Sequence, residues 1–273
     1  MKIAQPATIF VYIPLYLGIE GTEHTLTSYG TADKAIAAVS KGEADISIGD
    51  PFMFNYLNYK EKDVVIIAAF IRRVLHSLIT FNPFLQRADE ATLQGKSIVC
   101  YPEPSTSFFL AQQLKKKYEL GELLQTPFNT ELGPLLTEEA DVAVVLEPNA
   151  TYALHNGAKE LLDFSREAAV TTGFCMHRPQ YMKKKKEVQA FLSLVKKGID
   201  IFKEDPTKTE SVAQKYFPLV HPTILKAALA RIRNRDYYCE DFTFTDEEIE
   251  RGLALRDIDL SVKEARKLFI RGL

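Results

Sequence analysis

The chain has 273 residues, of which 46% are hydrophobic and 26% charged, and its 34 Lys and Arg nearly balance its 36 Asp and Glu. This balance argues against a protein that binds nucleic acid through a basic surface. The longest apolar runs, such as Val64–Ile71, are too short to cross a bilayer, and a chain of this length is expected to form about two domains.

The cysteines and the first residues of the chain further restrict the class of protein and its expected compartment. Cys100, Cys175 and Cys239 are too few and too widely spaced for a disulfide scaffold or a zinc site. The segment Met1–Pro6 is predicted to form a strand and a turn, without the basic, apolar and small-residue series of a secretory signal. We therefore expect a cytoplasmic protein as the sequence is written, or a periplasmic or cell-surface protein if a signal was trimmed.

The first 81 residues alternate expected strands and helices. One expected helix carries Ile36 and Val39 on one face and ends at Gly42. Strands and helices joined by short connections are typical of a doubly wound α/β sheet. The expected strands are Lys2–Ala4, His24–Tyr29, Ala44–Ile48, Asp63–Phe70 and Leu75–Phe81.

A second α/β unit follows the turn at Asn82-Pro83. Its expected strands are Ser97–Tyr101 and Asp141–Leu146, with a helix over Ser105–Tyr118, and Ala169–Met176 is the expected strand that returns from this unit.

Beyond Lys183 the pattern becomes helical. Apolar residues between Val188 and Phe202 recur with the period of an α-helix and stop at Asp205-Pro206. Two capping-box sequences, beginning at Thr245 and Ser261, predict the starts of two more helices.

These segments predict an α/β fold of two lobes with doubly wound sheets, in which the second lobe is inserted in the first. We place lobe I at residues 1–81 and 170–273, together with the C-terminal helices, and lobe II at residues 82–169. Such sheets bind ligands beyond the carboxyl ends of their strands, and a cleft between lobes is a common pocket. The candidate site residues are therefore those at strand ends.

Three consecutive hydroxyl residues, Ser105, Thr106 and Ser107, follow a loop and open a helix. Their hydroxyls and the free backbone N–H groups of the helix start suit an anion or a carbonyl oxygen. The alternative is that Ser105 only caps the helix.

Two carboxylates follow buried-type strands. Asp50 lies in Gly49-Asp50-Pro51-Phe52 and is either an N-cap or a ligand contact, and Glu147 ends the corresponding strand of the second lobe. If both acids face one cleft, they favour a ligand with N–H donors or positive charge over a simple dianion.

The loop after the first strand offers one hydroxyl, from Thr8, and two rings, from Phe10 and Tyr12, on which a flat ligand would stack. The alternative is that both rings cover a helix. The five histidines show no metal-ligand spacing. His76, on an expected strand near the crossing between the lobes, is the one that we expect to line a site.

Catalytic motifs are missing: the sequence has no GxGxxG, P-loop, HExxH, CxxC or GxSxG. The sequence Ser193-Leu194-Val195-Lys196 matches SxxK, but it lies within the amphipathic helix and has no partner motif. We expect no catalytic residue, no metal and no cofactor.

Several short segments, taken in order, resemble the solute-binding proteins of the nitrate/sulfonate/thiamine-pyrimidine class, a branch of the type II periplasmic binding protein fold. The segments are Gly42–Ile48, which contains GEADI, then Leu93–Val99 with Pro104–Ser107, Glu131–Leu136, Asp141–Val145, Glu147-Pro148, Phe202–Pro206 and Tyr216–Pro218. Each is weak alone, but together they cover nearly the whole chain.

The resemblance implies a monomeric protein that closes two lobes on one small ligand, pyrimidine-like, nitrogenous or sulfonate, and delivers it to an ABC permease. It places the ligand against the strand-end loops of both lobes, including Thr126–Asn129. The candidate ligand-binding residues are Thr8, Phe10, Tyr12, Asp50, Phe52, His76, Ser105, Thr106, Ser107, Asn129 and Glu147.

The same fold also serves cytoplasmic enzymes of the menaquinone-pathway and thiamine-pyrimidine types, and such an enzyme is the alternative function. The thiamine-pyrimidine enzyme carries a cysteine-rich cluster, to which nothing among Cys100, Cys175 and Cys239 corresponds. An effector-binding module of a regulator is a third alternative, less favoured because no DNA-binding segment precedes the fold.

Overall fold

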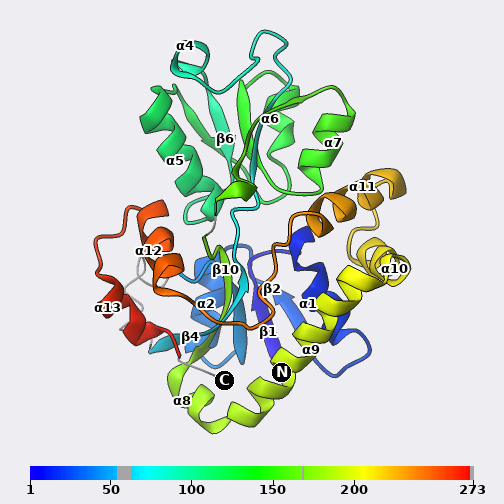
Figure 1. Ribbon diagram of the computed structural model, residues 1–273, viewed down its shortest axis with the longest axis vertical. Coiled ribbons are helices and arrows are strands. Elements are labelled where there is room, and N and C mark those ends of the chain that lie inside the picture. The colour runs from blue at the N-terminus through cyan, green and yellow to red at the C-terminus, as the bar shows by residue number, and fades with distance from the viewer. Residues whose placement is uncertain (54–62, 168, 271–273) are drawn as a thin grey trace. The chain divides into compact units, whose positions relative to one another are not determined.

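The computed structural model describes residues 1–53, 63–167 and 169–270. The contacts within the chain divide it into two compact units (Figure 1). Unit 1 comprises Met1–Arg73, Ala168–Leu219 and Asp236–Leu273, and unit 2 comprises Val74–Glu167 and Val220–Arg235. The chain therefore passes repeatedly from one unit to the other.

Unit 1 is built on a five-stranded mixed sheet. Across the sheet the strands are β2 (Thr25–Ser28), β1 (Lys2–Gln5), β3 (Ile46–Gly49), β10 (Thr172–His177) and β4 (Val64–Ile71). Strand β1 is parallel to β2 and β3, and β10 is antiparallel to both β3 and β4. All eight residues of β4 are buried, as a continuous apolar run requires when both faces of a strand are covered.

Two helices of unit 1, α1 (Ile13–Ile19) and α9 (Lys185–Glu204), run side by side (Figure 1). A glycine permits their close approach, because a Cβ atom on Gly198 would lie 1.9 Å from the carbonyl oxygen of Pro14. The buried face of α9 is the apolar stripe between Val188 and Phe202 that the sequence predicts.

The C-terminal part of unit 1 is helical, as predicted. Helix α12 (Asp246–Leu255) begins after Thr245 with a complete capping box to Glu248, and the Ser261 side chain caps α13 (Val262–Ala265). The other helices described in unit 1 are η1 (Phe10–Tyr12), α2 (Ala32–Ser40), α8 (Arg178–Lys183), α10 (Pro206–Tyr216) and η4 (Arg266–Leu268).

Unit 2 contains a second five-stranded mixed sheet. Its strands, in order, are β7 (Leu123–Gln125), β6 (Ile98–Cys100), β8 (Val142–Val145), β5 (Ser77–Thr80) and β9 (Lys159–Asp163). Strand β6 is parallel to β7 and β8, whereas β5 is antiparallel to β8 and β9.

Helices cover both faces of this sheet. Figure 1 shows α5 (Thr106–Tyr118) on one side and α6 (Leu132–Leu136) and α7 (Asn149–His155) on the other. Unit 2 also contains α4 (Glu90–Leu93), η3 (Phe164–Arg166) and α11 (Pro222–Arg233).

The predicted α/β fold with two sheets is confirmed. Strands β7 and β9 are not among the expected strands, because each is a short edge strand of half-exposed residues without a clear apolar pattern. The range Val220–Arg235, which the sequence assigns to lobe I, groups by its contacts with unit 2, where α11 packs against α7. The lobe boundaries drawn from the sequence stay a prediction.

Candidate ligand-binding site

Three parallel strands of unit 2, β6, β7 and β8, end at the same edge of the sheet, which we call the carboxyl edge. The loop after β6 leads to Ser105–Ser107, the loop after β7 contains Asn129 and Glu131, and the loop after β8 begins with Glu147. Ligands of such sheets bind outside this edge. The structure therefore brings five of the predicted site residues, those of unit 2 except His76, to one edge of one sheet.

The hydroxyls of Ser105 and Ser107, at the start of α5, bind within the protein. Ser105 Oγ accepts a hydrogen bond from the backbone N–H of Phe108 at 3.1 Å, so Ser105 is the N-cap of α5. Ser107 Oγ accepts from the backbone N–H of Tyr101 at 3.2 Å and donates to the carbonyl of Val144 at 3.2 Å. Both serines thus fix the loop geometry, and their role toward a ligand stays a prediction.

A fully buried carboxyl group, Glu131, lies at the carboxyl edge. Its Oε1 accepts hydrogen bonds from the Tyr101 hydroxyl at 2.9 Å and from Asn149 Nδ2 at 3.0 Å. Asn149 Nδ2 also donates to the backbone carbonyl of Asn129 at 3.3 Å, and the ring of Phe128 lies 4.7 Å from that of Tyr101. One carboxyl group therefore connects the segments that follow all three strands.

Burial raises the pKa of Glu131 to about 7, although hydrogen bonds from its own backbone N–H, from Asn149, from Tyr101 and from the backbone of Leu146 act in the opposite direction. Sequence reasoning missed this residue as part of a site, because Glu131 before Leu132 looks like the ordinary acidic start of a helix. Its burial depends on Tyr101 and Asn149, which no local pattern links to it.

Glu147, the predicted strand-end acid of unit 2, is buried and paired. Its Oε1 accepts from Arg231 Nε at 2.7 Å, and its Oε2 accepts from the backbone N–H of Thr151 at 3.0 Å. Burial raises the pKa of Glu147, against the lowering effects of Thr151 and Arg231. Arg231 also donates to Glu160 at 2.9 Å, and its side chain is 25% exposed.

Asp50, the predicted strand-end acid of unit 1, is also paired with an arginine. Its Oδ1 accepts from the backbone N–H of Phe52 at 3.0 Å, and its Oδ2 accepts from Arg256 Nε at 2.8 Å. The Arg256 guanidinium lies 4.9 Å from the Phe52 ring centroid and is fully buried. Asp50 and Phe52 thus hold the C-terminal segment in place, and their contact with a ligand stays a prediction.

The aromatic residues of the first loop lie in the core of unit 1. Phe10 is fully buried with its ring edge-on to Phe217 at 5.0 Å, and Tyr12 is buried with its ring 6.3 Å from that of Phe70. Burial raises the pKa of Tyr12. Thr8 is half-buried in the loop before η1. The structure places these residues near the carboxyl end of β1, as the sequence predicts, with both rings packed against other aromatic side chains.

His76 is buried in unit 2, directly before β5. Its backbone carbonyl accepts a hydrogen bond from the N–H of Phe164 at 3.1 Å, which ties β5 to the segment after β9. Whether its imidazole meets a ligand stays a prediction.

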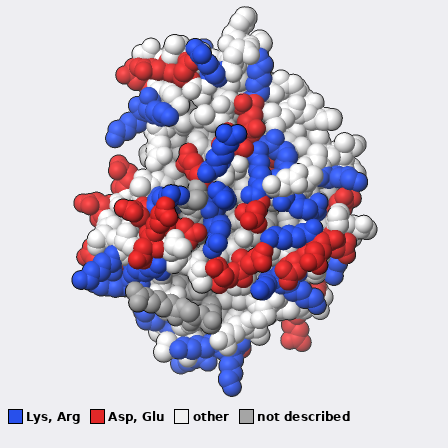
Figure 2. All heavy atoms as spheres, viewed as in Figure 1, with Lys and Arg blue, Asp and Glu red and all other residues white. Residues whose placement is uncertain are grey.

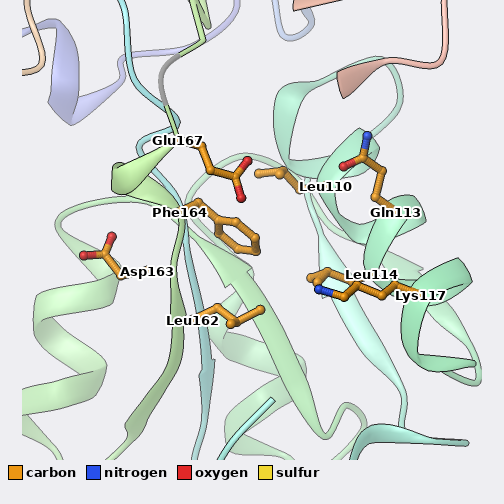
Figure 3. Close-up of a pocket in the computed structure, with 8 residues that line it drawn as sticks. All are labelled: Leu110, Gln113, Leu114, Lys117, Leu162, Asp163, Phe164 and Glu167. Atoms are coloured by element: carbon orange, nitrogen blue, oxygen red, sulfur yellow. The ribbon is translucent and has the colours of Figure 1, made fainter. Parts of the chain in front are cut away.

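A separate cavity of about 170 Å³ lies within unit 2, between α5 and the segment that spans β9 and η3 (Figure 3). The Phe164 ring points into it, facing Leu110 and Leu114 of α5. Asp163 points away in the same view and pairs with Arg235 at 2.9 Å. None of the predicted ligand-binding residues lines this cavity.

The surface charge is mixed. Figure 2 shows Lys and Arg interspersed with Asp and Glu over the drawn face, in line with the net charge of −2. One ion pair of unit 1 joins Lys215 and Glu20, 2.8 Å apart.

The thiol groups are buried and held in the neutral form. Burial raises the pKa of Cys100 and of Cys239 to about 12, and that of Cys175 well above its usual value. A thiol with such a pKa is a poor nucleophile. Among residues 1–53, 63–167 and 169–270, no three His, Cys, Asp or Glu side chains are grouped to hold a metal ion. Within the same ranges, no helix combines the length and apolar character needed to span a membrane.

Solved structures of the same architecture define the class of fold. The alkanesulfonate-binding protein SsuA from Xanthomonas axonopodis pv. citri, bound to MOPS, is 12% identical over 100% of this chain and 98% of its own, with a TM-score of 0.77. The aliphatic sulphonate-binding protein SsuA from Escherichia coli is 11% identical over 100% and 94%, with a TM-score of 0.75. The ligand-binding component of an ABC-type import system from Staphylococcus aureus is 14% identical over 94% and 90%, with a TM-score of 0.72. The chain therefore has the periplasmic binding protein fold.

The family follows from the sequence itself. Residues 16–209 match the family described as NMT1/THI5 like, and the chain belongs to this family. No curated protein sequence matched the chain. The resemblance drawn from the sequence motifs is confirmed.

Proposed function

We propose that this chain is the solute-binding component of an ABC importer, in which strand-end loops of both units contact one small organic ligand. The candidate ligand classes are those implied by the sequence: pyrimidine-like, nitrogenous and sulfonate compounds. Lobe closure on the ligand would produce the form that the permease accepts, because a ligand with contacts in both lobes favours the closed state. The family and the likeness to sulfonate-binding and import proteins support this role.

The observation that carries the proposal is the construction of the carboxyl edge of unit 2. Its loops are fixed by internal hydrogen bonds at Ser105, Ser107 and Glu131. A partly exposed guanidinium, that of Arg231, is held between Glu147 and Glu160. Small-molecule sites place a few fixed polar groups among mostly apolar side chains, and the fixed loops and the guanidinium would supply those polar groups.

The ion pairs change the expected ligand chemistry. The two unpaired carboxylates that the sequence suggests would favour a cationic ligand, but Asp50 is paired with Arg256, and Glu147 is paired with Arg231, which also binds Glu160. A cation would therefore meet no unpaired strand-end acid. A partly exposed guanidinium donates hydrogen bonds and accepts none. We therefore rank acceptor-rich ligands, such as a sulfonate or a heterocycle with ring nitrogens, above cations.

A thermal-shift screen tests this proposal. The compounds are short alkanesulfonates, aminopyrimidines, nitrate and amino acids, and hits are confirmed by titration calorimetry. We expect a shift from a sulfonate or pyrimidine. If amino acids alone bind, the ranking is wrong; if no compound binds, the solute-binding role loses its support.

A pair of variants locates the site. Asn129 is exposed with φ 67° in the loop after β7, so Asn129→Gly removes the side chain and keeps the backbone. We expect affinity for the confirmed ligand to fall about tenfold, the loss for one hydrogen bond. Asn156→Gly, at the opposite end of α7 from Asn149, is the matched control. Equal affinities would exclude the carboxyl edge, and conversion of the bound compound, followed by NMR, would favour the enzyme alternative.

A further inference from the structure

A single side chain joins the three loops of the carboxyl edge of unit 2. Tyr101 belongs to the loop after β6, Glu131 to the loop after β7, and Asn149 to the segment after β8. The hydroxyl of Tyr101 and the amide of Asn149 both donate to the same oxygen, Oε1 of Glu131. The bond from Tyr101 is buried, since Glu131 is 0% and Tyr101 2% exposed, and the bond from Asn149 is partly buried.

We propose that Glu131 is the positioning residue of the ligand-binding edge, and that its carboxyl group holds the three loops together in the protonated form. The inference rests on the proposed function for the meaning of that edge. Glu131 itself is too deeply buried to touch a ligand, so it acts through Tyr101 and Asn149.

The second oxygen explains why the proton matters. Oε2 of Glu131 is buried and lacks a hydrogen-bond partner, and the backbone N–H groups of Glu131 and Leu146, which lower the pKa of the carboxyl group, do not offset the effect of its burial. A carboxylate with one oxygen in this environment lacks the compensation that a buried negative charge requires, whereas the neutral acid leaves one O–H donor unmatched but carries no charge. The titratable group that faces it is Tyr101, whose own pKa is raised by burial and by Glu131. Asn149, from α7, is uncharged. No cation compensates Glu131 among the causes of its raised pKa.

Deprotonation would therefore place an uncompensated charge where the three loops meet. We expect the loops to loosen together as the pH rises past about 7, and to stay joined below it. Glu131→Gln preserves one acceptor oxygen and the shape of the neutral acid, and it has no proton to lose. It is thus the conservative variant that should rescue the joined state at high pH.

Hydrogen–deuterium exchange of the ligand-free full chain tests the proposal at about pH 6 and about pH 8, with rates corrected for intrinsic exchange. One reporter amide lies in each loop: Tyr101, bonded to Ser107 Oγ, Thr130, bonded to the carbonyl of Pro127, and Ala150, bonded to that of Leu146. In the wild type we expect all three to exchange at least about fivefold faster at the higher pH, the effect of one lost hydrogen bond.

The variants separate positioning from general stability. Glu131→Gln should abolish the pH difference, Glu131→Ala should give fast exchange at both pH values, and Glu122→Gln, an exposed change in the same unit, should behave as the wild type. A pH difference that persists in Glu131→Gln, or one confined to the loop of Thr130, would overturn the proposal.

Binding of butanesulfonate, whose charge is constant over this pH range, gives the functional readout. We expect its affinity to fall with rising pH in the wild type and to stay constant in Glu131→Gln. A pH-independent affinity of the wild type, measured together with faster exchange of the loops at high pH, would overturn the positioning role. Absence of butanesulfonate binding in every variant would count against a sulfonate ligand, and the ligand-free exchange would still decide the role of Glu131.

Discussion

The strand-end acids of the two units look alike in sequence and differ in their surroundings. Asp50 and Glu147 both follow a buried strand, precede a proline, accept a backbone N–H and pair with an arginine from the C-terminal part of the chain. The arginine of Asp50 is completely buried, whereas that of Glu147 is 25% exposed. The same local motif thus forms a sealed structural ion pair in unit 1 and a water-accessible one in unit 2. Only the second can exchange water for a ligand without breaking the core.

The largest effect should come from the sealed pair. Asp50→Ala leaves the buried Arg256 without its carboxylate, so we expect a loss of about 3–5 kcal/mol in unfolding free energy. Urea unfolding followed by circular dichroism measures it, with Glu43→Ala as an exposed control. The double variant Asp50→Ala/Arg256→Met should recover much of the loss, since it removes the unpaired charge. A loss below about 1 kcal/mol, typical of surface pairs, would show that the pair is not sealed.

The next largest effect is a pH dependence of the unfolding free energy that arises from Glu131 in unit 2. The pKa of Glu131 is about 7 in the folded chain, against an ordinary value of 4.5 for a glutamate. Its folded-state pKa is raised, so its contribution is complete below about pH 4.5 and is lost as the pH rises through about 7. We expect wild-type stability to fall over this range by about 2–3 kcal/mol more than that of Glu131→Gln. Parallel pH profiles of the two proteins would contradict this.

The water-accessible pair should matter less than the sealed one. Glu147→Ala leaves Arg231 bonded to Glu160 and open to solvent, so we expect a cost of about 1–2 kcal/mol, measured by the same urea unfolding. If Glu147→Ala proved as damaging as Asp50→Ala, the difference in exposure between the two arginines would have no energetic meaning.

The smallest expected effect compares one helix of each unit. Ser105 caps α5 through a bond to the N–H of Phe108, whereas the Thr31 side chain makes no such bond at the start of α2. Ser105→Ala should therefore lower stability by about 1 kcal/mol, and Thr31→Ala should change it by less than about 0.5 kcal/mol. Thermal unfolding of both variants distinguishes these values, and equal shifts would argue against a capping role specific to Ser105.

Local signals account for most of the fold. The apolar run of β4, the stripe of α9 and the capping box at Thr245 each reflect interactions within one segment, which a sequence window reveals. The edge strands β7 and β9 lack such a signal, because half-exposed strands take their form from their neighbours.

In the candidate site, contacts between residues far apart in the sequence matter more than local signals. The sequence places Asp50 and Glu147 at strand ends correctly, but the arginines that pair with them lie 206 and 84 residues away along the chain. Pairings over such separations leave no trace in a single sequence. The burial of Glu131 arises in the same way, from residues 30 and 18 positions distant. The ligand chemistry expected from unpaired acids therefore changes once the fold is known.

The position of β10 has a consequence for synthesis of the chain. In the sheet of unit 1, β10 lies between β3 and β4 and pairs with both. As the chain leaves the ribosome, β4 has no β10 to pair with until residue 172 has been synthesised. The residues made in between belong mostly to unit 2. Eight consecutive apolar residues in β4 would then be open to intermolecular pairing. Newly made chains are accordingly most vulnerable to aggregation after unit 2 begins to fold and before unit 1 can close its sheet.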